Sequence, residues 1–566
     1  MRNKKLALLA AAGSLMTGVV AAQIMRYTQT EATTARYDVQ RTGWIRLDHF
    51  IAPDKMNGFA LQWKTKLVNT PRNGAALGSG IVANGGLGIT LAYLGLADNR
   101  TVSIDMDNGF VFFNRAYGPT APASPASCLS ASLATPTRAT TLIPVPSPTP
   151  TPAGQSTTGP NAQLPFGSVI GRPGEGIPPV KPGSYFTAPG SFFATPGAKP
   201  YDGTPESAAE GAAFSASGGS SAGRGPANLD GGGPGRGPGG PGRGRGPGGF
   251  GGFGGGIVIY AVSNDGMLRR LTTHDGLDGN QPIPFLPVGA QATDLTLVNN
   301  VVYTATVNGC GGAPNGVWSI ASAAVPAGAA FPKPTSWLTG GTASPHLPAF
   351  NADGVLYVTV GSGTGQFADS VVALEPSTLA VRAKFTLAGA NFASPAVILR
   401  EGTRDLVAAQ AADGRIIVLD GANLATPLAS SPAVPNLSGY KPNGLAAWQD
   451  ATGQAWLLST TPNAVVAHKL TATSVTQAWT LGNLKSPLAP LVINGVVFAV
   501  SAGDPKNPAI LHAVNALSGQ PIWNSGKTMT SYVPQASALW NSMGQVVVGA
   551  YDGTLYAFGV NLERHL

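Results

Sequence analysis

The 566-residue sequence contains only two cysteines, and charged residues make up just 11% of it. Cys128 and Cys310 permit no more than one disulfide within the chain. The six histidines form no i,i+4 pair or other close ligand pair, which removes the usual local signature of a zinc site. No Gly-x-Ser-x-Gly or phosphate-binding Gly-x-x-x-x-Gly-Lys motif stands out. The sequence therefore predicts no catalytic residue and no metal ligand.

Long apolar runs are missing beyond the N-terminus, where the sequence has the pattern of an export signal. Three basic residues among the first five precede apolar residues 6–22, and small residues at 20–22 lie ahead of a cleavage site before Gln23. The alternative is an uncleaved anchor, but a bilayer span needs about 20 apolar residues. We therefore expect residues 1–22 to be removed, leaving a periplasmic or extracellular protein without a stable membrane span.

A recurring nine-residue pattern is the most informative feature present. Each copy has a polar, often acidic position, a turn position four residues later and an apolar residue four further on. The copies begin at residues 105, 272, 321, 375, 420, 471, 515 and 559. A period of about 40 to 55 residues is typical of a β-propeller. The chain is predicted to be all-β, with eight four-stranded blades, or seven if the weaker copy at Ala321 is false.

The two ends of the chain are predicted to seal the ring together. The last copy, at Gly559, ends too near Leu566 to build its own outer strand. Residues 61–67 alternate between apolar and polar side chains, which suits a half-buried strand. We expect this segment, around Trp63, to pair beside Tyr556 and leave no open sheet edge.

Composition divides the remaining chain into three parts. Residues 37–117 hold the closing strand and the first blade, and residues 257–566 hold the other blades. Between them, residues 118–255 are dominated by Pro, Ser, Thr, Ala and Gly, which cannot bury enough apolar surface to offset chain ordering. We interpret this part as a long disordered insert. Its Gly/Arg-rich run could contact nucleic acid, but in an exported chain we interpret it as a solvated linker.

A disulfide between Cys128 and Cys310 would tie the start of this insert to the loop 309–312. An even cysteine count in an exported protein permits that pairing. The alternative is two unrelated, unpaired cysteines.

The recurring polar and glycine positions are assigned an architectural role. A carboxylate can cap backbone N–H groups of the following turn, and glycine adopts a conformation that other residues resist. The apolar position, such as Trp479 or Trp523, can then pack between blades. The run 105–109 resembles part of a calcium loop but lacks the downstream glutamate, so we interpret Asp105 as a turn cap.

These residues carry a family resemblance. Residues 514–523 (Val-Asn-Ala-Leu-Ser-Gly-Gln-Pro-Ile-Trp) resemble the pyrroloquinoline-quinone-type propeller repeat, as do residues 550–558 and the Ser-Pro openings at Ser344, Ser394 and Ser486. That superfamily includes quinoprotein dehydrogenases and non-catalytic propellers, among them an outer-membrane-protein assembly lipoprotein. Many of the dehydrogenases carry adjacent cysteines in a disulfide ring over the quinone. This chain has no adjacent pair, no Cys-x-x-Cys-His haem site and no lipid-attachment cysteine.

Three functions follow as hypotheses. The leading one is an exported, non-catalytic propeller that binds an unknown protein or small-molecule ligand on a ring face, as a binding or scaffold module of the cell envelope. It predicts no enzyme activity, no cofactor and no nucleic-acid partner. The second is a divergent oxidoreductase that uses pyrroloquinoline quinone with calcium. The third is a surface or matrix protein that acts through its Gly/Arg-rich insert.

Overall fold

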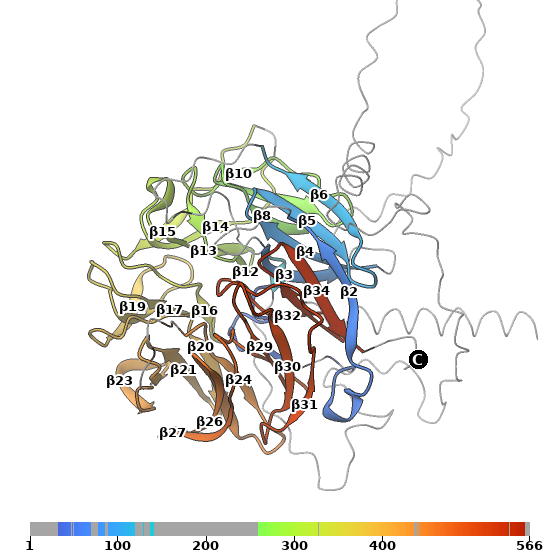
Figure 1. Cartoon of the computed structure of the whole chain (residues 1–566). Coiled ribbons are helices and arrows are strands. Elements are labelled where there is room, and N and C mark those ends of the chain that lie inside the picture. The colour runs from blue at the N-terminus through green and yellow to red at the C-terminus, as the bar shows by residue number, and fades with distance from the viewer. Residues whose placement is uncertain are drawn as a thin grey trace, which may run out of the picture.

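Eight β-sheets follow one another around a ring in the computed structural model of the chain (Figure 1). The structure describes residues 32–46, 48, 50–68, 77–84, 89–118, 128, 136–140 and 258–560, the last range without 327, 435, 436, 438, 439, 441, 472 and 543. The prediction of an all-β propeller with eight blades is confirmed. Ala321 ends a strand at the position that its repeat copy predicts, so that copy belongs to the series.

Seven blades contain an inner, a second, a third and an outer strand, and in blade 2 a bridge at Thr137 takes the inner position. We number the blades along the chain. Blade 1 comprises β3 (Leu77–Asn84), β4 (Thr90–Leu96), β5 (Arg100–Asp105) and β6 (Val111–Ala116). Blade 2 comprises β8 (Val258–Val262), β9 (Met267–Thr272) and β10 (Ile283–Pro284), with an inner bridge from Thr137 to Tyr260. Blade 3 comprises β12 (Thr296–Val298), β13 (Val301–Val307), β14 (Gly316–Ala321) and β15 (Thr335–Leu338), joined by β7 (Ala139–Thr140) and β11 (Gln291–Ala292).

The next three blades each have four strands. Blade 4 comprises β16 (Ala349–Phe350), β17 (Leu356–Val360), β18 (Ser370–Leu374) and β19 (Val381–Thr386). Blade 5 comprises β20 (Val397–Glu401), β21 (Arg404–Gln410), β22 (Ile416–Asp420) and β23 (Asn423–Ser430). Blade 6 comprises β24 (Ala446–Gln449), β25 (Ala455–Thr461), β26 (Ala464–Thr471) and β27 (Ser474–Leu481).

The last two blades each take a strand from the N-terminal part of the chain. Blade 7 comprises β28 (Leu491–Ile493), β29 (Val496–Ser501), β30 (Ile510–Asn515) and β31 (Pro521–Asn524), with β1 (Trp44–Ile45) added inside β28. Blade 8 comprises β32 (Trp540–Ser542), β33 (Gln545–Gly549), β34 (Thr554–Gly559) and β2 (Ala60–Lys66). Two single-turn 3₁₀ helices, η1 (Pro53–Lys55) and η2 (Cys310–Gly312), interrupt the connections.

The ring closes where the sequence predicts. Strand β2 pairs antiparallel with β34, with Trp63 opposite Ala557 and Lys64 opposite Tyr556. Figure 1 shows the blue β2 beside the red β34. The Trp63 indole N–H then donates to the carbonyl of Met106 in blade 1 at 2.9 Å. The first and last parts of the chain are therefore joined by non-covalent contacts alone.

Burial follows the position of each strand in its blade. Every residue of β17 and β18 is buried, because a middle strand packs against a neighbouring blade on both of its faces. The outer strand β19 instead alternates between exposed and partly buried residues. The apolar core is thus a series of interblade layers rather than one central cluster.

One hydrogen bond recurs between blades. Its acceptor is the carbonyl of the residue directly after the first position of a repeat, and its donor is an aromatic side chain of the preceding blade. In the early blades the donor is a tyrosine of the second strand: Tyr93 to Thr273 (2.9 Å), Tyr260 to Ser322 (3.2 Å), Tyr303 to Pro376 (3.0 Å) and Tyr357 to Gly421 (2.8 Å). In the late blades it is a tryptophan of the outer strand: Trp479 to Ala516 (3.0 Å) and Trp63 to Met106 (2.9 Å).

The turn glycines make room for these tryptophans. Gly519 has a φ of +71°, and a Cβ built on it would lie 2.7 Å from the Trp479 ring. Gly109 has a φ of +76°, and a Cβ there would lie 2.6 Å from Trp63. Both the backbone conformation and the close approach require glycine.

Part of the predicted insert belongs to the ring. Thr137 bridges to Tyr260, and β7 pairs in parallel with β12, although composition places these residues within 118–255. Apart from residues 118, 128 and 136–140, that range lies outside the described residues, as do residues 1–22. Among the residues that the structure does describe, no helix is long and apolar enough to cross a membrane.

Candidate functional site at the ring axis

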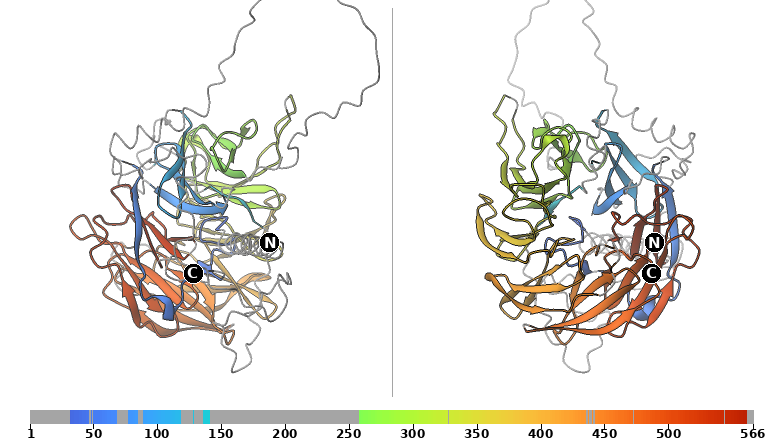
Figure 2. Two further views of the ribbon diagram at one scale, coloured as in Figure 1. Left: turned by 90° about the vertical axis from the view of Figure 1, so that its right-hand side faces the viewer. Right: turned by 60° about the vertical axis from the view of Figure 1, so that its left-hand side comes forward.

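The centre of the ring is filled by the chain itself. Residues 32–48, which we call the axial segment, contact the inner part of all eight blades, and the blue N-terminal residues lie within the ring in the right-hand view of Figure 2. In chain order, the axial segment meets blades 1, 2 and 3, then blades 4 to 7, and finally blade 8. It therefore occupies the axis that the eight inner strands surround.

Backbone hydrogen bonds hold most of this segment. Six of its carbonyl oxygens accept N–H groups of the inner strands, at distances of 2.9–3.0 Å. The pairs are Ala32 with Val82, Thr33 with Arg138, Val39 with Phe350, Gln40 with Ile398, Thr42 with Ala447 and Gly43 with Val492. Both partners in these bonds are main-chain groups, so the bonds do not depend on the side chains of the ring. The segment turns back on itself at residues 34–40, where Arg36 and Tyr37 have positive φ.

Arg41 is the most deeply buried cation of the segment, with 1% of its surface exposed. Its Nε donates to the Pro348 carbonyl at 3.1 Å, its Nη1 donates to Thr34 Oγ1 and the Ala35 carbonyl, and its Nη2 donates to Thr296 Oγ1. Burial lowers the pKa of Arg41 to about 10, against the opposing effect of Asp294 and Asp38. The guanidinium therefore stays charged at neutral pH. Its hydrogen bonds offset the cost of removing the charge from water.

Arg36 makes similar contacts on the late blades. Its Nη2 donates to the Leu445 carbonyl at 2.6 Å and its Nη1 to the Ala489 carbonyl at 3.3 Å. Both acceptors lie one or two residues ahead of an inner strand, as does the Pro348 carbonyl that Arg41 contacts. We call this side of the ring, which carries the connections between blades, the connection face. Burial lowers the pKa of Arg36 to about 10.

Two carboxylates fix the backbone of the axial segment. Asp38 accepts the N–H and hydroxyl of Thr42 and an Arg46 nitrogen at 3.2 Å. Asp48 is completely buried and accepts four N–H groups, two from the following turn and two from blade 8, at Asn541 and Gly544. The oxygens of both carboxylates are therefore engaged by this chain's own donors.

Polar side chains link the connections of the late blades around the axis. The Tyr440 hydroxyl donates to the Pro487 carbonyl at 3.1 Å, and the Gln535 amide donates to the Ser486 carbonyl. The partly exposed rings of Tyr532 and Tyr551 stack with centroids 4.5 Å apart. This part of the connection face presents aromatic side chains, which are enriched at binding surfaces.

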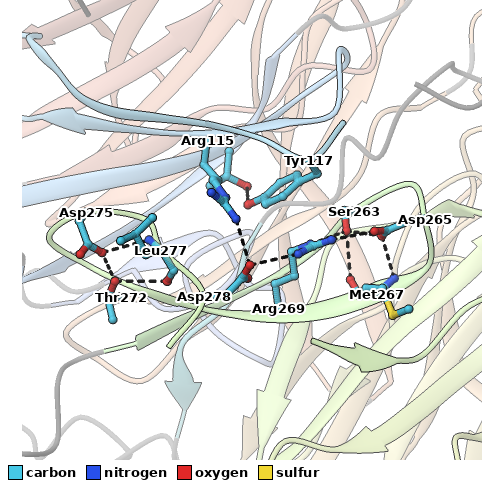
Figure 3. A network of polar contacts seen from close by, with 11 residues as sticks. Arg115, Tyr117, Ser263, Asp265, Met267, Arg269, Thr272, Asp275, Leu277 and Asp278 are labelled. Carbon is cyan, nitrogen blue, oxygen red and sulfur yellow. Dashed lines mark hydrogen bonds and ion pairs between the residues drawn. The ribbon is translucent and has the colours of Figure 1, made fainter. Parts of the chain in front are cut away.

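A charged network joins blades 1 and 2 (Figure 3). Asp278 accepts Arg115 at 3.0 Å and Arg269 at 3.2 Å, and Arg269 also pairs with Asp265 at 2.7 Å. The Arg269 guanidinium lies 4.9 Å from the ring centroid of Tyr117. These groups neutralise one another across the seam, so we assign them a structural role.

The histidines do not come together. His274 pairs with Asp275 at 3.1 Å, His346 Nε2 lies 2.9 Å from the Phe392 carbonyl oxygen, His468 Nε2 lies 3.0 Å from Ser459 Oγ, and His512 is half-buried on β30. His49 and His565 lie outside the described residues. No group of three His, Cys, Asp or Glu side chains that could hold a metal is found within the described ranges.

The two cysteines and Asp105 occupy loop positions. Cys128 and Cys310 are paired as a disulfide, with Cα atoms 5.6 Å apart, so a residue between blades 1 and 2 is tied to a loop of blade 3. Asp105 accepts the N–H of Asp107 at 2.9 Å and the Asn108 amide at 3.1 Å, as a turn cap does. Burial and the neighbouring Asp107 charge raise the pKa of Asp105 to about 6.

Sequence reasoning missed the axial segment. Residues 32–48 match no repeat position. Most of their contacts with the ring are made through backbone groups, which every residue has and which leave no signature in the sequence. The one available signal was a pair of arginines, Arg36 and Arg41, with Gly43 nearby, in a stretch that had no predicted strand of its own.

The chain folds as an eight-bladed β-propeller with residues 32–48 at its axis. Similar solved structures include a quinohemoprotein alcohol dehydrogenase from Comamonas testosteroni, with a TM-score of 0.53, 13% identity, and coverage of 97% of this chain and 84% of that one. A second, from Pseudomonas putida HK5, has a TM-score of 0.51, 11% identity, and coverage of 95% and 82%. A europium-containing methanol dehydrogenase has a TM-score of 0.52, 10% identity, and coverage of 95% and 100%.

These likenesses confirm the predicted resemblance at the level of the fold. At such low identity they establish the fold alone. No family model matches the sequence, and no curated protein matches it either.

The residues at the axis do not fit pyrroloquinoline quinone with calcium. The axial segment contacts the inner part of all eight blades, and the carboxylates of Asp38 and Asp48 already accept N–H and hydroxyl groups. A calcium ion takes six to eight oxygen ligands, for which no carboxylate cluster gathers among the described residues. We therefore derive no reaction step through such a cofactor.

Proposed function

We propose that this protein is an exported, non-catalytic propeller that binds a protein partner or ligand on its connection face, in the periplasm or outside the cell. The observation that carries the proposal is the filled axis. Because residues 32–48 occupy the ring centre, and the side chains of Arg36, Asp38, Arg41 and Asp48 are engaged by this chain's own groups, we take the outer surface of the connection face as the site of recognition.

The stacked pair Tyr532 and Tyr551, with the exposed Gln535, is the proposed contact region. Aromatic side chains supply large contact area at low entropic cost, and amides supply directional hydrogen bonds. A Tyr532→Ala, Gln535→Ala double variant should lose the partner while keeping the fold.

Crosslinking of the purified protein to candidate envelope proteins tests this proposal. A specific adduct that forms with the natural protein and disappears in the double variant would support it. A Val381→Ala variant on the exposed outer strand β19 is the matched control, and it should crosslink normally. Crosslinking that is equal in all three proteins would contradict the proposed face.

The second candidate is a divergent quinone-dependent oxidoreductase, which the fold likeness to quinohemoprotein and methanol dehydrogenases favours. It requires a quinone to bind off the axis or to displace the axial segment. Titration with pyrroloquinoline quinone and calcium, or a lanthanide, should then change the quinone absorbance and give dye reduction with an alcohol. No spectral change at a large excess of cofactor would remove this candidate.

A further inference from the structure

We propose that the inner strands of the ring form a receptor for a peptide, and that residues 32–57 are the peptide this chain supplies to itself. The occupant has a defined chemistry. It folds through turns at residues 34–40 and carries two arginines five residues apart and a carboxylate seven residues further on, at Arg36, Arg41 and Asp48. The inference does not depend on the proposed partner binding at the connection face.

The first support is the type of contact. The ring offers backbone N–H groups on blades 1, 2, 4, 5, 6 and 7 to six carbonyls of the segment. Main-chain contacts of this kind give affinity, whereas contacts with side chains select the sequence. The receptor is therefore built largely from the backbone of the inner strands, with a few ring side chains such as Thr296 and Asn541 added to it.

The second support is the set of hydrogen bonds that the ring makes with the charged side chains of the segment. Backbone carbonyls of Pro348, Leu445 and Ala489 converge on the two guanidiniums from three different blades. At the far end of the segment, Asn541 and the Gly544 N–H hold the Asp48 carboxylate. Charge-assisted hydrogen bonds at both ends fix the register of the segment in the ring.

The third support is a group of buried apolar residues at 45–56, in the C-terminal half of the segment, which we call the anchor. Ile45 and Ile51 are fully buried, and Met56 is 4% exposed, in one cluster with Phe498 and Leu511 of blade 7. The anchor ends at Asn57 and Gly58, which are exposed, and Gly58 has no atom near the position of an added Cβ. The closing strand β2 begins beyond this turn, so a break at Gly58 would free the peptide without removing β2.

The experiment starts from the full chain. A site-specific protease sequence is inserted between Asn57 and Gly58, the protein is folded and then cut, and a fluorescent synthetic peptide of residues 32–57 is added. We expect the labelled peptide to replace the cut fragment slowly and saturably, while gel filtration and circular dichroism show a folded monomer. Uncut protein, in which the segment is tethered, should take up far less label.

Peptide variants avoid any effect on folding of the ring. An Arg41→Ala peptide should bind at least about tenfold more weakly. The substitution leaves the Pro348 carbonyl and the Thr296 hydroxyl of the ring without their charged donor. A scrambled peptide of the same composition should not bind. Two results would overturn the proposal: label that never enters a cut ring that stays folded, or a ring that unfolds as the fragment leaves, which would make residues 32–57 an integral core element.

Discussion

Two regions of the ring join their blades with different donors to the same acceptor. Between blades 1 and 5 the donor is a tyrosine hydroxyl from the second strand, whereas Trp479 and Trp63 supply an indole N–H from the outer strand of blades 6 and 8. In every case the acceptor carbonyl follows the first position of a repeat. The turn geometry therefore fixes the acceptor, and the donor can come from either strand that reaches it.

The seam between blades 5 and 6 differs from both kinds. His468 lies on the same face of β26 as Leu470, which packs with Val418 and Ala429 of blade 5. Its Nε2 lies 3.0 Å from Ser459 Oγ, in a buried setting. A buried polar pair thus lies at this seam, whereas six other seams carry an aromatic donor, and the stability of the protein should depend on pH.

Trp63→Ala should cause the largest loss of stability, because Trp63 both closes the ring and packs in the seam between blades 8 and 1. Truncating a buried tryptophan costs about 4 kcal/mol of the free energy of unfolding. Urea denaturation measures the loss. Trp63→Phe, which keeps most of the apolar contact and removes the N–H donor, should lose about 1 kcal/mol. A Trp63→Ala protein as stable as Trp63→Phe would contradict the sealing role.

Removal of the disulfide should cause the next largest loss of stability. Changing Cys128 and Cys310 together to serine should lower the free energy of unfolding by about 3 kcal/mol, because the bridge constrains a long loop of the unfolded chain. Thermal unfolding with and without reductant measures the effect, and a thiol assay of the native protein should find no free thiol. Two reactive thiols in the unfolded, unreduced protein would contradict the pairing.

The third prediction concerns pH at the exceptional seam. Burial lowers the pKa of His468 to about 4, whereas an unfolded histidine titrates near 6.5. Between these values the unfolded chain binds more protons, so stability falls as the pH falls, by about 2 kcal/mol between pH 7 and pH 5.

A His468→Gln variant checks this pH dependence by urea denaturation at several pH values. Its stability should be flatter than that of the natural protein over the same range, with Ser459→Ala as the control that retains the histidine. Identical pH profiles for the natural protein and His468→Gln would refute the assignment.

The smallest effect is expected at a tyrosine seam. Tyr357→Phe removes one hydroxyl that donates to Gly421 and leaves the ring packed, so it should lose about 1 kcal/mol. Tyr260→Phe, whose hydrogen bond is longer at 3.2 Å, should lose less. Equal stability of the Tyr357→Phe protein and the natural protein would show that the tyrosine seams rely on packing alone.

The periodic parts of the structure could be predicted from sequence because each repeat specifies its own turn. Asp105 and Asn515 cap turns locally, and the alternation of side chains around Trp63 predicted a strand that could pair beside Tyr556. The tyrosine seams escaped prediction because a hydroxyl that donates to a carbonyl on the next blade leaves no local pattern.

The axial segment also escaped prediction because its contacts with distant parts of the chain leave no local pattern. Its partners lie in eight blades spread over the whole chain, and most are backbone groups. The boundary of the insert was also hidden, because the bridge at Thr137 and the two-residue strand β7 lie in a stretch of low-complexity composition.

Hydrogen exchange at the inner strands tests the filled axis most directly. The amides of Phe350, Ile398 and Ala447 donate to Val39, Gln40 and Thr42 of the axial segment. In the natural protein these amides should exchange slowly, and in an Arg36→Ala, Arg41→Ala variant they should exchange much faster while the middle strands stay protected. Rapid exchange of the inner-strand amides in the natural protein would show that the ring centre is open and would contradict the account.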